Sequence, residues 1–319
     1  MSDTSNLPEY ALEAIDLRKT YRGGGKAPDK EALKGIDLKV KRGSFFGLLG
    51  PNGAGKSTFI NIFAGLTNKT SGVARTWGVD IDQDSRAARA AIGVVPQEIS
   101  ADVFFTPYET LELMAGFYGV PKKERRTDEL LEVLGLTDKR DAYVRQLSGG
   151  MKRRLLVAKA MVHTPPVLVL DEPTAGVDIE LRRQLWEFVR ELHAKGTTIV
   201  LTTHYLEEAQ ELCDEIAIID HGKVIACEPK ETLLKRMDRK TLVITPGEAL
   251  GAVPASLDGL DAEIRDDGSL AISYRFGEVS VAEMIERFHA SGARIADLRT
   301  EEADLEDVFL SLTYNREDA

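Results

Sequence analysis

Short runs of apolar residues alternate along the chain with longer segments whose apolar residues recur at the spacing of one helix face. Runs of the first kind are typical of buried strands, and segments of the second kind are typical of amphipathic helices. Their alternation predicts an α/β core. The expected buried strands are 46–49, 92–97, 167–170, 198–201 and 216–219, and helices are expected at 56–65, 151–163 and 179–194.

Two segments near the start of the chain have alternating apolar and polar residues, which predicts half-buried strands. Residues 10–20 alternate like an edge strand and end at Tyr21, and residues 34–40 form the second strand. Glycine-containing turns follow both segments.

A mostly α-helical insertion is predicted at about residues 98–165, between two of the buried strands. It contains a capping box, in which Thr106 is the N-cap and Glu109 the third helical residue. The stretch 104–118 holds five aromatic residues. The pattern alone leaves two interpretations of these aromatics open, packing in the core or an exposed docking groove.

The excess of acidic residues that gives the chain a net charge of −11 lies in residues 241–319. Residues 241–319 hold 17 acidic residues against 6 arginines, whereas residues 1–240 hold 35 residues of each sign. This change predicts a domain boundary after residue 240, followed by a small acidic α+β domain. Acidic surfaces disfavour nucleic acid and anionic lipid as direct partners. The expected strands of this domain lie near 241–245, 262–265, 270–275 and 294–299, and its helices near 280–290 and 304–313.

The chain shows no segment that predicts insertion into a bilayer. No apolar run approaches the roughly 18–20 residues needed for a membrane span, and the polar residues 1–6 lack the layout of a signal peptide. We therefore expect the chain to remain in the cytoplasm.

A glycine-rich turn joins the strand 46–49 to the helix that follows and matches the pattern G-x-x-x-x-G-K-[ST]. Small residues in such a turn let backbone N–H groups surround a phosphate at a helix N-terminus. Lys56 is then expected to reach the β- and γ-phosphates, and Ser57 to ligate Mg²⁺. The loop residues are Gly50, Pro51, Asn52, Gly53, Ala54, Gly55, Lys56, Ser57 and Thr58.

Polar side chains stand at the carboxyl ends of three predicted strands, where open α/β sheets bind ligands. Gln97 is suited to bind Mg²⁺ and to orient a water. Asp171 and Glu172 are adjacent, so their side chains point to opposite faces of the strand and can take different roles. We expect Asp171 to hold Mg²⁺ and Glu172 to polarise the attacking water. His204 ends a further strand.

A second glycine-rich entry to a helix occurs at 147–150, with Ser148 as the expected N-cap. Gly149 and Gly150 leave the helix N-terminus accessible. The segment is either a capped helix start or a second anion site.

Together these motifs give residues 12–235 a resemblance to the ATP-binding subunit of ABC transporters. The matches are the aromatic loop at Tyr21, the phosphate loop at 50–58, the glutamine loop at Gln97, the signature at 147–150, the magnesium-binding strand ending in Asp171, the base Glu172, the D-loop at 175–178 and the switch histidine His204. The resemblance implies a P-loop NTPase (RecA-like) core with an inserted helical subdomain, and an ATPase that uses ATP and Mg²⁺.

The resemblance also implies partners. Two cassettes pair head to tail, so that Ser148 and Gly150 of one copy contact the ATP held by Lys56 of the other. Asp178 of the D-loop lies at the same interface. A separate membrane permease is expected to sit near Gln97 and the stretch 104–118, which places the chain on the cytoplasmic face of the membrane.

Two departures from the family pattern, Met151 after the signature and 175–177 in the D-loop, leave the catalytic set intact. The residues after the signature, 151–154, and the residues 305–309 near the end of the chain resemble those of one branch of the family. Members of this branch export drugs, polyketides, polysaccharides or lipids. An importer ATPase would share the catalytic residues. A soluble family member of translation or DNA repair is disfavoured by the single cassette and the acidic tail. The transported substance is not encoded in this chain, because its pocket lies in the permease.

Overall fold

The computed structural model describes residues 7–25, 28–98, 102–174, 179–203, 205–236, 239–275, 279–302 and 305–313. The chain forms two compact units, residues 1–230 and residues 231–319. The change in charge predicted a boundary after residue 240, whereas the contacts place the division after Lys230 and assign most of helix α8 (Lys230–Arg236) to the second unit.

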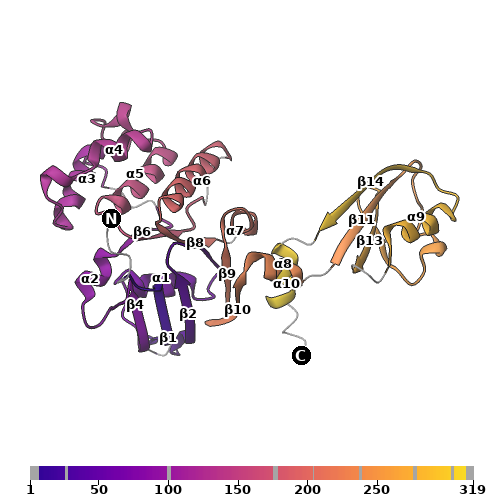
Figure 1. The fold of residues 1–319 in the computed structure, drawn as a ribbon, viewed down its shortest axis with the longest axis horizontal. Helices are drawn as coiled ribbons and strands as arrows, with labels where there is room; N and C mark the ends of the chain where they lie inside the picture. Colours follow the sequence, from indigo (N-terminus) through magenta and orange to yellow (C-terminus); the bar gives the residue numbers. More distant parts are fainter. Residues whose placement is uncertain are drawn as a thin grey trace. The chain divides into compact units, whose positions relative to one another are not determined.

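The first unit is built on a six-stranded sheet (Figure 1). Five adjacent strands of this sheet run parallel to one another. The sixth strand lies at one edge and is joined to its neighbour as an antiparallel hairpin. The register places Leu49 beside Thr203 and Asp171 beside Thr202, so the carboxyl ends of the central strands form one edge. In spatial order the strands are β10 (Lys223–Pro229), β9 (Glu215–Asp220), β3 (Phe45–Leu49), β8 (Thr198–Thr203), β7 (Val167–Asp171) and β6 (Ile92–Val95).

A second, four-stranded antiparallel sheet contains the half-buried strands of the chain start. Its order is β2 (Lys30–Lys41), β1 (Tyr10–Tyr21), β4 (Ser71–Thr76) and β5 (Val79–Asp80). The sequence correctly predicted a strand at 10–20, but its expected edge position is wrong, because β1 pairs with β2 on one side and β4 on the other. Its alternation arises because only one face of this sheet is covered.

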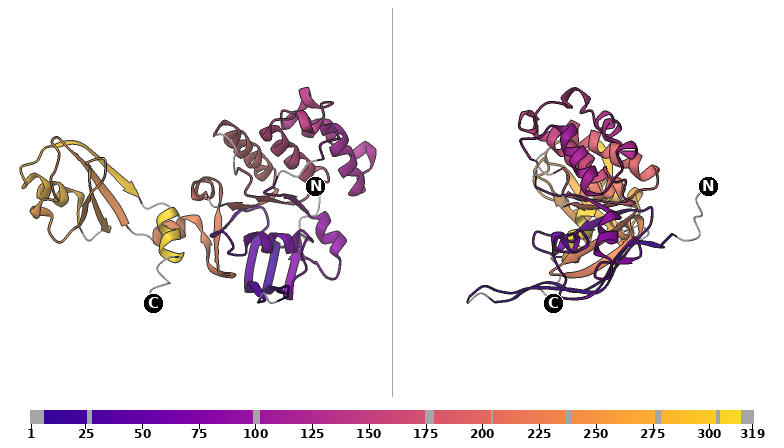
Figure 2. Two further views of the ribbon diagram at one scale, coloured as in Figure 1. Left: turned by 180° about the vertical axis from the view of Figure 1, so that it is seen from behind. Right: turned by 90° about the vertical axis from the view of Figure 1, so that its left-hand side faces the viewer.

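Helix α1 (Lys56–Phe63) connects the two sheets through one core (Figures 1 and 2). The rings of Phe59 and Phe63 are fully buried with centroids 4.9 Å apart, and they pack with Leu12 and Leu33 of the second sheet and Val169 of the first. The helix that begins at the phosphate loop is therefore held rigidly from both sides.

Helices α3 to α6 lie on the face of the six-stranded sheet opposite to the second sheet (Figure 1). The expected capping box is present, with Glu109 N donating to Thr106 Oγ1 and Thr106 N donating to Glu109 Oε2. The described α-helices of the first unit are α1, α2 (Ser85–Ala90), α3 (Pro107–Phe117), α4 (Thr127–Val133), α5 (Gly149–Met161), α6 (Ile179–Ala194) and α7 (Leu206–Leu212), with short 3-10 turns at Lys122–Glu124, Thr137–Lys139 and Val144–Gln146. Among the described residues no helix combines the length and apolarity needed to cross a bilayer.

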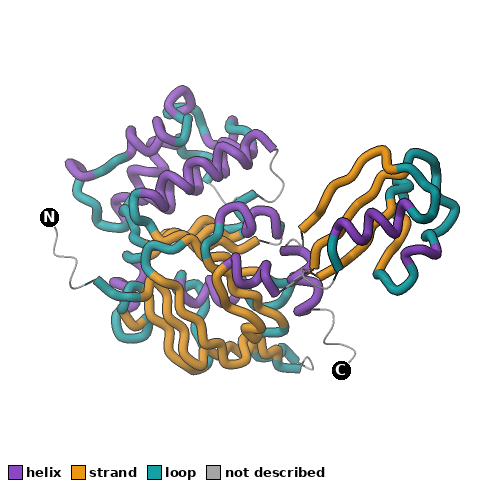
Figure 3. Tube along the Cα trace, turned by 45° about the vertical axis from the view of Figure 1, so that its right-hand side comes forward, coloured by secondary structure: helices purple, strands orange, loops and turns teal. Residues whose placement is uncertain are grey.

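The second unit contains an antiparallel sheet with helix α9 packed on one face (Figure 3). The sequence predicted the strands and helices of an α+β unit, but not this pairing. Leu242 and Ile272 of the sheet pack with Met284 and Phe288 of α9. The strands are β12 (Asp261–Ile264), β13 (Leu270–Arg275), β11 (Arg239–Pro246) and β14 (Ile295–Glu302), and the helices are α9 (Val281–His289), α10 (Leu305–Thr313) and the 3-10 turn Ala255–Leu257.

Candidate nucleotide-binding site

The loop between β3 and α1 has a backbone path that only glycine can follow at two positions. Gly50 has a φ of +159°, and a Cβ there would lie 2.1 Å from the carbonyl oxygen of Ile219. Gly55 has a φ of +116°, and a Cβ there would lie 2.8 Å from the carbonyl oxygen of Ala32. The glycines thus let the loop pass close to β9 and β2 and turn directly into the helix N-terminus, where anions bind.

The side chain of Lys56 folds back into this loop. Its Nζ donates hydrogen bonds to the carbonyl oxygens of Gly50 at 2.6 Å and Pro51 at 3.2 Å. Burial lowers the pKa of this ammonium, while the nearby carboxylates of Glu172 and Asp171 raise it. The loop thus carries a buried cation, held by its own carbonyls, beside the helix N-terminus.

Asp171 ends β7 with its side chain 8% exposed. Its pKa is raised, because burial outweighs the hydrogen bonds from Thr202 and Ser57 and the attraction of Lys56. A buried carboxylate beside a serine hydroxyl is the type of oxygen donor set that Mg²⁺ prefers. The residues present therefore fit a magnesium ion.

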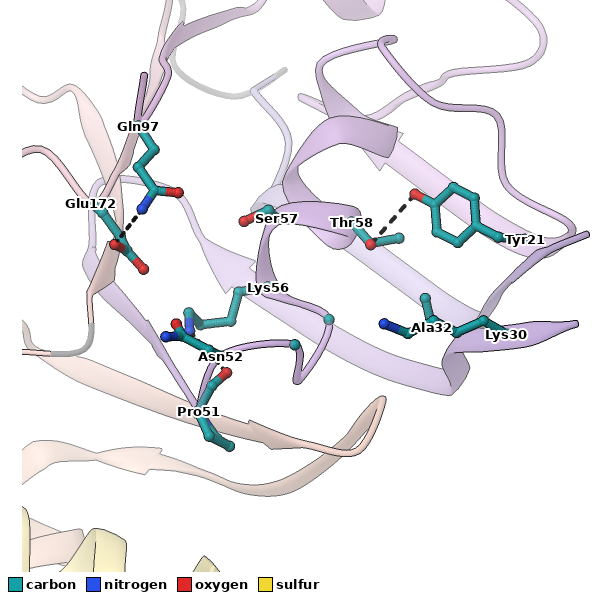
Figure 4. A pocket seen from close by; sticks show the side chains of 12 residues that line it. Tyr21, Lys30, Ala32, Pro51, Asn52, Lys56, Ser57, Thr58, Gln97 and Glu172 are labelled. Atoms are coloured by element: carbon teal, nitrogen blue, oxygen red, sulfur yellow. Dashed lines mark hydrogen bonds between the residues drawn. The ribbon is translucent and has the colours of Figure 1, made fainter. Parts of the chain in front are cut away.

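Glu172 lies next to this pair in a left-handed backbone conformation, with a φ of +46°. The conformation is fixed by Thr202, whose carbonyl oxygen and hydroxyl accept hydrogen bonds from Glu172 N at 3.0 and 3.1 Å. The glutamate side chain is 8% exposed and accepts a 2.8 Å hydrogen bond from Gln97 Nε2 (Figure 4). Gln97 comes from the loop after β6, so the edge of the sheet brings the two predicted residues together.

The phosphate loop, Gln97 and Glu172 line one cleft of about 290 Å³, and Tyr21 stands at its other end (Figure 4). The Tyr21 ring is 39% exposed, with its hydroxyl 3.5 Å from Thr58 Oγ1 and the Lys19 ammonium 4.6 Å from the ring centroid. Lys30 also lines the cleft. Sequence reasoning missed it, because a single lysine at the start of a strand carries no local signal. The cleft thus offers an aromatic surface at one end and a cationic phosphate site at the other.

The signature residues lie outside this cleft. Ser148 caps α5 by accepting a 3.2 Å hydrogen bond from Met151 N, which confirms the predicted N-cap. Ser148 and Gly149 are exposed, and neither lines the cleft of its own chain. Two further expected site residues, Asp178 and His204, lie outside the described residues.

Comparison with known proteins identifies the family. Residues 33–175 match the family described as ABC transporter. The Nod factor export ATP-binding protein I of Ralstonia nicotianae is 38% identical over 95% of this chain and 93% of its own length. The chain belongs to the ABC transporter ATP-binding family. The expected resemblance and the P-loop ATPase fold are therefore confirmed, and the protein is an ATP-binding, ATP-hydrolysing cassette.

Other relatives of this ABC cassette point in the same direction. The linearmycin resistance ATP-binding protein LnrL of Bacillus subtilis is 36% identical over 95% of this chain and 98% of its own length. The daunorubicin/doxorubicin resistance ATP-binding protein DrrA of Streptomyces peucetius is 38% identical over 96% of this chain and 93% of its own length. These relatives and the Nod factor protein confirm the expected likeness to the exporter branch.

A solved structure, the dimeric post-hydrolysis state of the cassette MJ0796 bound to ADP and Pi, matches with a TM-score of 0.62 and 28% identity. It covers 69% of this ABC cassette chain and 98% of its own. The curated relatives, by contrast, match along nearly the whole chain. The second unit is therefore within the region shared with the export and resistance proteins.

Proposed function

We propose that this ABC cassette is the ATP-hydrolysing subunit of a membrane exporter whose permease is a separate chain. The observation that carries the chemistry is the single cleft in which Lys56, Gln97 and Glu172 meet. The full-length likeness to proteins named for Nod factor export and for antibiotic resistance supports the exporter assignment and disfavours an importer. By the same likeness, the first candidates for transport are compounds of the kinds in these names, a Nod factor, linearmycin or daunorubicin.

Within this proposal the adenine ring stacks on Tyr21 and the phosphates lie in the loop 50–58. Lys56 and the loop N–H groups bind the β- and γ-phosphates. Ser57, Asp171 and Gln97 hold Mg²⁺, which neutralises phosphate charge when it is bound. Glu172 accepts a proton from the attacking water, which Gln97 orients. The family resemblance gives His204, which lies outside the described residues, a role in the same step. The positions of Tyr21, Lys56, Gln97 and Glu172 around the cleft support these proposed roles, and the family resemblance supports the others.

The exposed signature supports the proposed dimer. Ser148 and Gly149 project from the N-terminus of α5 and are free of contact with their own cleft. In a head-to-tail pair they would contact the γ-phosphate bound at Lys56 of the second copy, and Gly150 and Asp178 would lie at the same interface. The dimeric ADP and Pi structure of a related cassette supports this arrangement.

A groove where α3 and α5 of the helical insertion meet β6 supports a permease site on the cytoplasmic face of the membrane. It has a volume of about 320 Å³ and is lined by apolar side chains that include Leu66, Met114 and Tyr118. Phe104 and Phe117 of the insertion do not line this groove, but each is 73% exposed. An apolar groove with exposed aromatics suits a short helix of a permease.

The experiment that tests this proposal is ATP hydrolysis and transport by the cassette expressed together with the membrane protein encoded beside it. We expect ATP-dependent movement of labelled compound out of cells, and loss of both activities in Lys56→Ala, because that ammonium is the main side-chain charge on the phosphates. Hydrolysis by Lys56→Ala within twofold of wild type would remove the loop from its proposed role. Accumulation of label inside cells would instead favour an importer.

A further inference from the structure

Helix α5 lies antiparallel along β6 and contacts it at three places. At one end, Nε2 of His163 lies 3.3 Å from the carbonyl oxygen of Ile92. In the middle, a Cβ on Gly93 would lie 2.3 Å from the carbonyl oxygen of Ala160, so helix and strand touch directly. At the other end, Arg153 reaches the residues that follow the strand. Ten helical residues and five extended residues both span about 15–17 Å, so the three contacts share one register.

Arg153 is the contact nearest the nucleotide cleft. Its side chain is 2% exposed, and its two terminal nitrogens donate to adjacent carbonyl oxygens, Nη1 to Pro96 at 2.6 Å and Nη2 to Gln97 at 2.8 Å. The planar guanidinium fork fixes both carbonyls at once, which a single ammonium cannot do. The backbone of Gln97 is therefore tied to the helix that begins at Ser148.

The side chain of Gln97 continues this connection into the cleft. Its Nε2 donates a 2.8 Å hydrogen bond to the carboxylate of Glu172. A displacement of the Gln97 backbone by about 1 Å would stretch this bond beyond hydrogen-bonding distance. Ser148, Arg153, Gln97 and Glu172 thus form one connected path from the signature to the candidate base.

We propose that Arg153 is a positioning residue for ATP hydrolysis, which transmits the position of the signature helix to the Gln97–Glu172 pair. This inference rests on the proposed roles of Glu172 and Ser148. When Ser148 engages the ATP of the second copy, the position of α5 is fixed, and Arg153 fixes Gln97 with it. The orientation of the base in one cleft then depends on contact made by the signature of the same chain.

The matched control is Arg154, the next residue of the same helix. Its Nη1 donates to the carbonyl oxygen of Leu134 at 2.9 Å, inside the helical insertion and away from Gln97. Replacing either arginine by methionine removes a partly or fully buried guanidinium from α5. Only the change at Arg153 releases the backbone of Gln97.

The test measures kcat and KM for ATP in full-length Arg153→Met, Arg154→Met, Gln97→Ala and the double variant Arg153→Met with Gln97→Ala. We expect Arg153→Met to lower kcat about 10- to 100-fold, the cost of a small misplacement of a catalytic group. Its KM should stay within about twofold, because the phosphate loop is untouched, and Arg153→Lys should recover part of the loss. Arg154→Met should keep a kcat near that of wild type.

The double variant separates positioning from a general structural role. If Arg153 acts through Gln97, adding Arg153→Met to Gln97→Ala should lower kcat no further. An equal loss in Arg154→Met, or a full further loss in the double variant, would overturn the proposal. Should Arg153→Met fail to fold, Arg153→Lys takes its place in the same cycle. Its single ammonium keeps the charge but cannot hold both carbonyl oxygens, so we expect a smaller loss of kcat that disappears in the Gln97→Ala background.

The outcomes also separate this inference from the proposed function. Normal hydrolysis by Glu172→Gln would refute the assigned base, whatever Arg153 does. An inactive Glu172→Gln together with a fully active Arg153→Met would refute only the positioning role.

Discussion

The hydroxyl of Thr174 donates a hydrogen bond to the carboxylate of Glu208, a side chain with no exposed surface. Thr203 donates a second hydrogen bond to this carboxylate at 2.9 Å, and Nε of Arg182 lies 3.9 Å from it. Thr174 follows β7 shortly after Asp171, and Thr203 ends β8. One buried carboxylate on α7 therefore holds the chain segments at the ends of two central strands.

Glu208→Ala should destabilise the first unit strongly, because it leaves two hydroxyls without their buried acceptor and the Arg182 guanidinium without the carboxylate of its ion pair. We expect a loss of about 3 kcal/mol in the free energy of unfolding, and about 1 kcal/mol for Glu208→Gln, which keeps one acceptor oxygen. Urea unfolding followed by tryptophan fluorescence measures it, because Trp77 and Trp186 both belong to the first unit. Glu211→Ala is the control, since Glu211 lies on the same helix and is 57% exposed. Equal midpoints for Glu208→Ala and Glu211→Ala would contradict the expectation.

Glu172→Gln should slow ATP hydrolysis by about 10²- to 10⁴-fold, the usual contribution of a positioned base. Nucleotide binding should survive, because Lys56, Ser57 and Asp171 are unchanged. With hydrolysis stopped, the variant should elute from a sizing column as a dimer in ATP, where the wild type is largely monomeric. An inactive protein that stays monomeric in saturating ATP would argue against the head-to-tail pair in free solution.

Ser148→Arg in the Glu172→Gln background tests the signature. The added side chain would intrude where the γ-phosphate of the second copy is expected, so the ATP-dependent dimer should be lost. The side chain of Ser148 is exposed, and its hydrogen bond with Met151 N caps α5. Loss of this cap destabilises the protein by about 1 kcal/mol. The double variant should therefore stay folded. Persistence of the dimer would remove Ser148 from the interface.

Charge on the exposed aromatic residues of the stretch 104–118 should uncouple hydrolysis from transport. Phe104→Glu and Phe117→Glu each place a carboxylate on a side chain that is 73% exposed. We expect basal ATP hydrolysis within twofold of wild type, with strongly reduced export and reduced co-purification with the permease. Val133→Glu is the control, because Val133 is an exposed apolar residue of α4 outside the stretch 104–118. Unchanged export in both phenylalanine variants would place the permease elsewhere.

His163 should make the first unit less stable as the pH falls from 6.5 toward 4. Burial lowers the pKa of this imidazole from 6.5 to about 4, and its ring stacks on Tyr118 with centroids 3.6 Å apart. Below pH 6.5 the imidazole of His163 is protonated in the unfolded chain but still neutral in the folded chain. The free energy of unfolding therefore decreases as the pH falls, until the folded imidazole is protonated too. The decrease is on the order of 2–3 kcal/mol. Urea midpoints between pH 4.5 and 7 should vary less in His163→Phe.

The exposed His221 supplies the control for this pH dependence. Its side chain is 79% exposed, so His221→Asn should leave the pH dependence as in wild type. If His163→Phe follows the wild-type curve as closely as His221→Asn does, the loss at low pH originates in other groups.

The phosphate loop and the strand ends could be predicted because their signals are contiguous. The residues 50–58 form one motif, and Gln97 and Glu172 each follow a recognisable apolar run. Their contact could not be predicted from the sequence, because it depends on β6 and β7 being neighbours in the sheet. The register of parallel strands comes from packing of both faces, which leaves no local pattern.

Residues that hold the site residues in place from distant parts of the chain could not be recognised in the sequence. Thr202 fixes Glu172 across 30 residues, and Arg153 fixes Gln97 across 56. A single threonine or arginine is common on any strand or helix, so only the fold reveals its partner. The contacts divide the chain after Lys230, whereas the acidic composition begins only after residue 240, because residues 231–240 hold charges of both signs.

The exposed position of Ser148 and Gly149 has a consequence for enzyme kinetics. If the proposed head-to-tail pair forms, a molecule whose signature lies outside its own cleft carries two half-sites and no complete one. In free solution the rate per molecule should therefore rise with protein concentration, as expected for a reaction that requires an encounter. A permease that holds two copies side by side would replace that dependence with a fixed effective concentration, which linked binding sites commonly raise to the millimolar range. The membrane partner would then act as the switch that lets the cassette work at the low abundance of a transporter subunit.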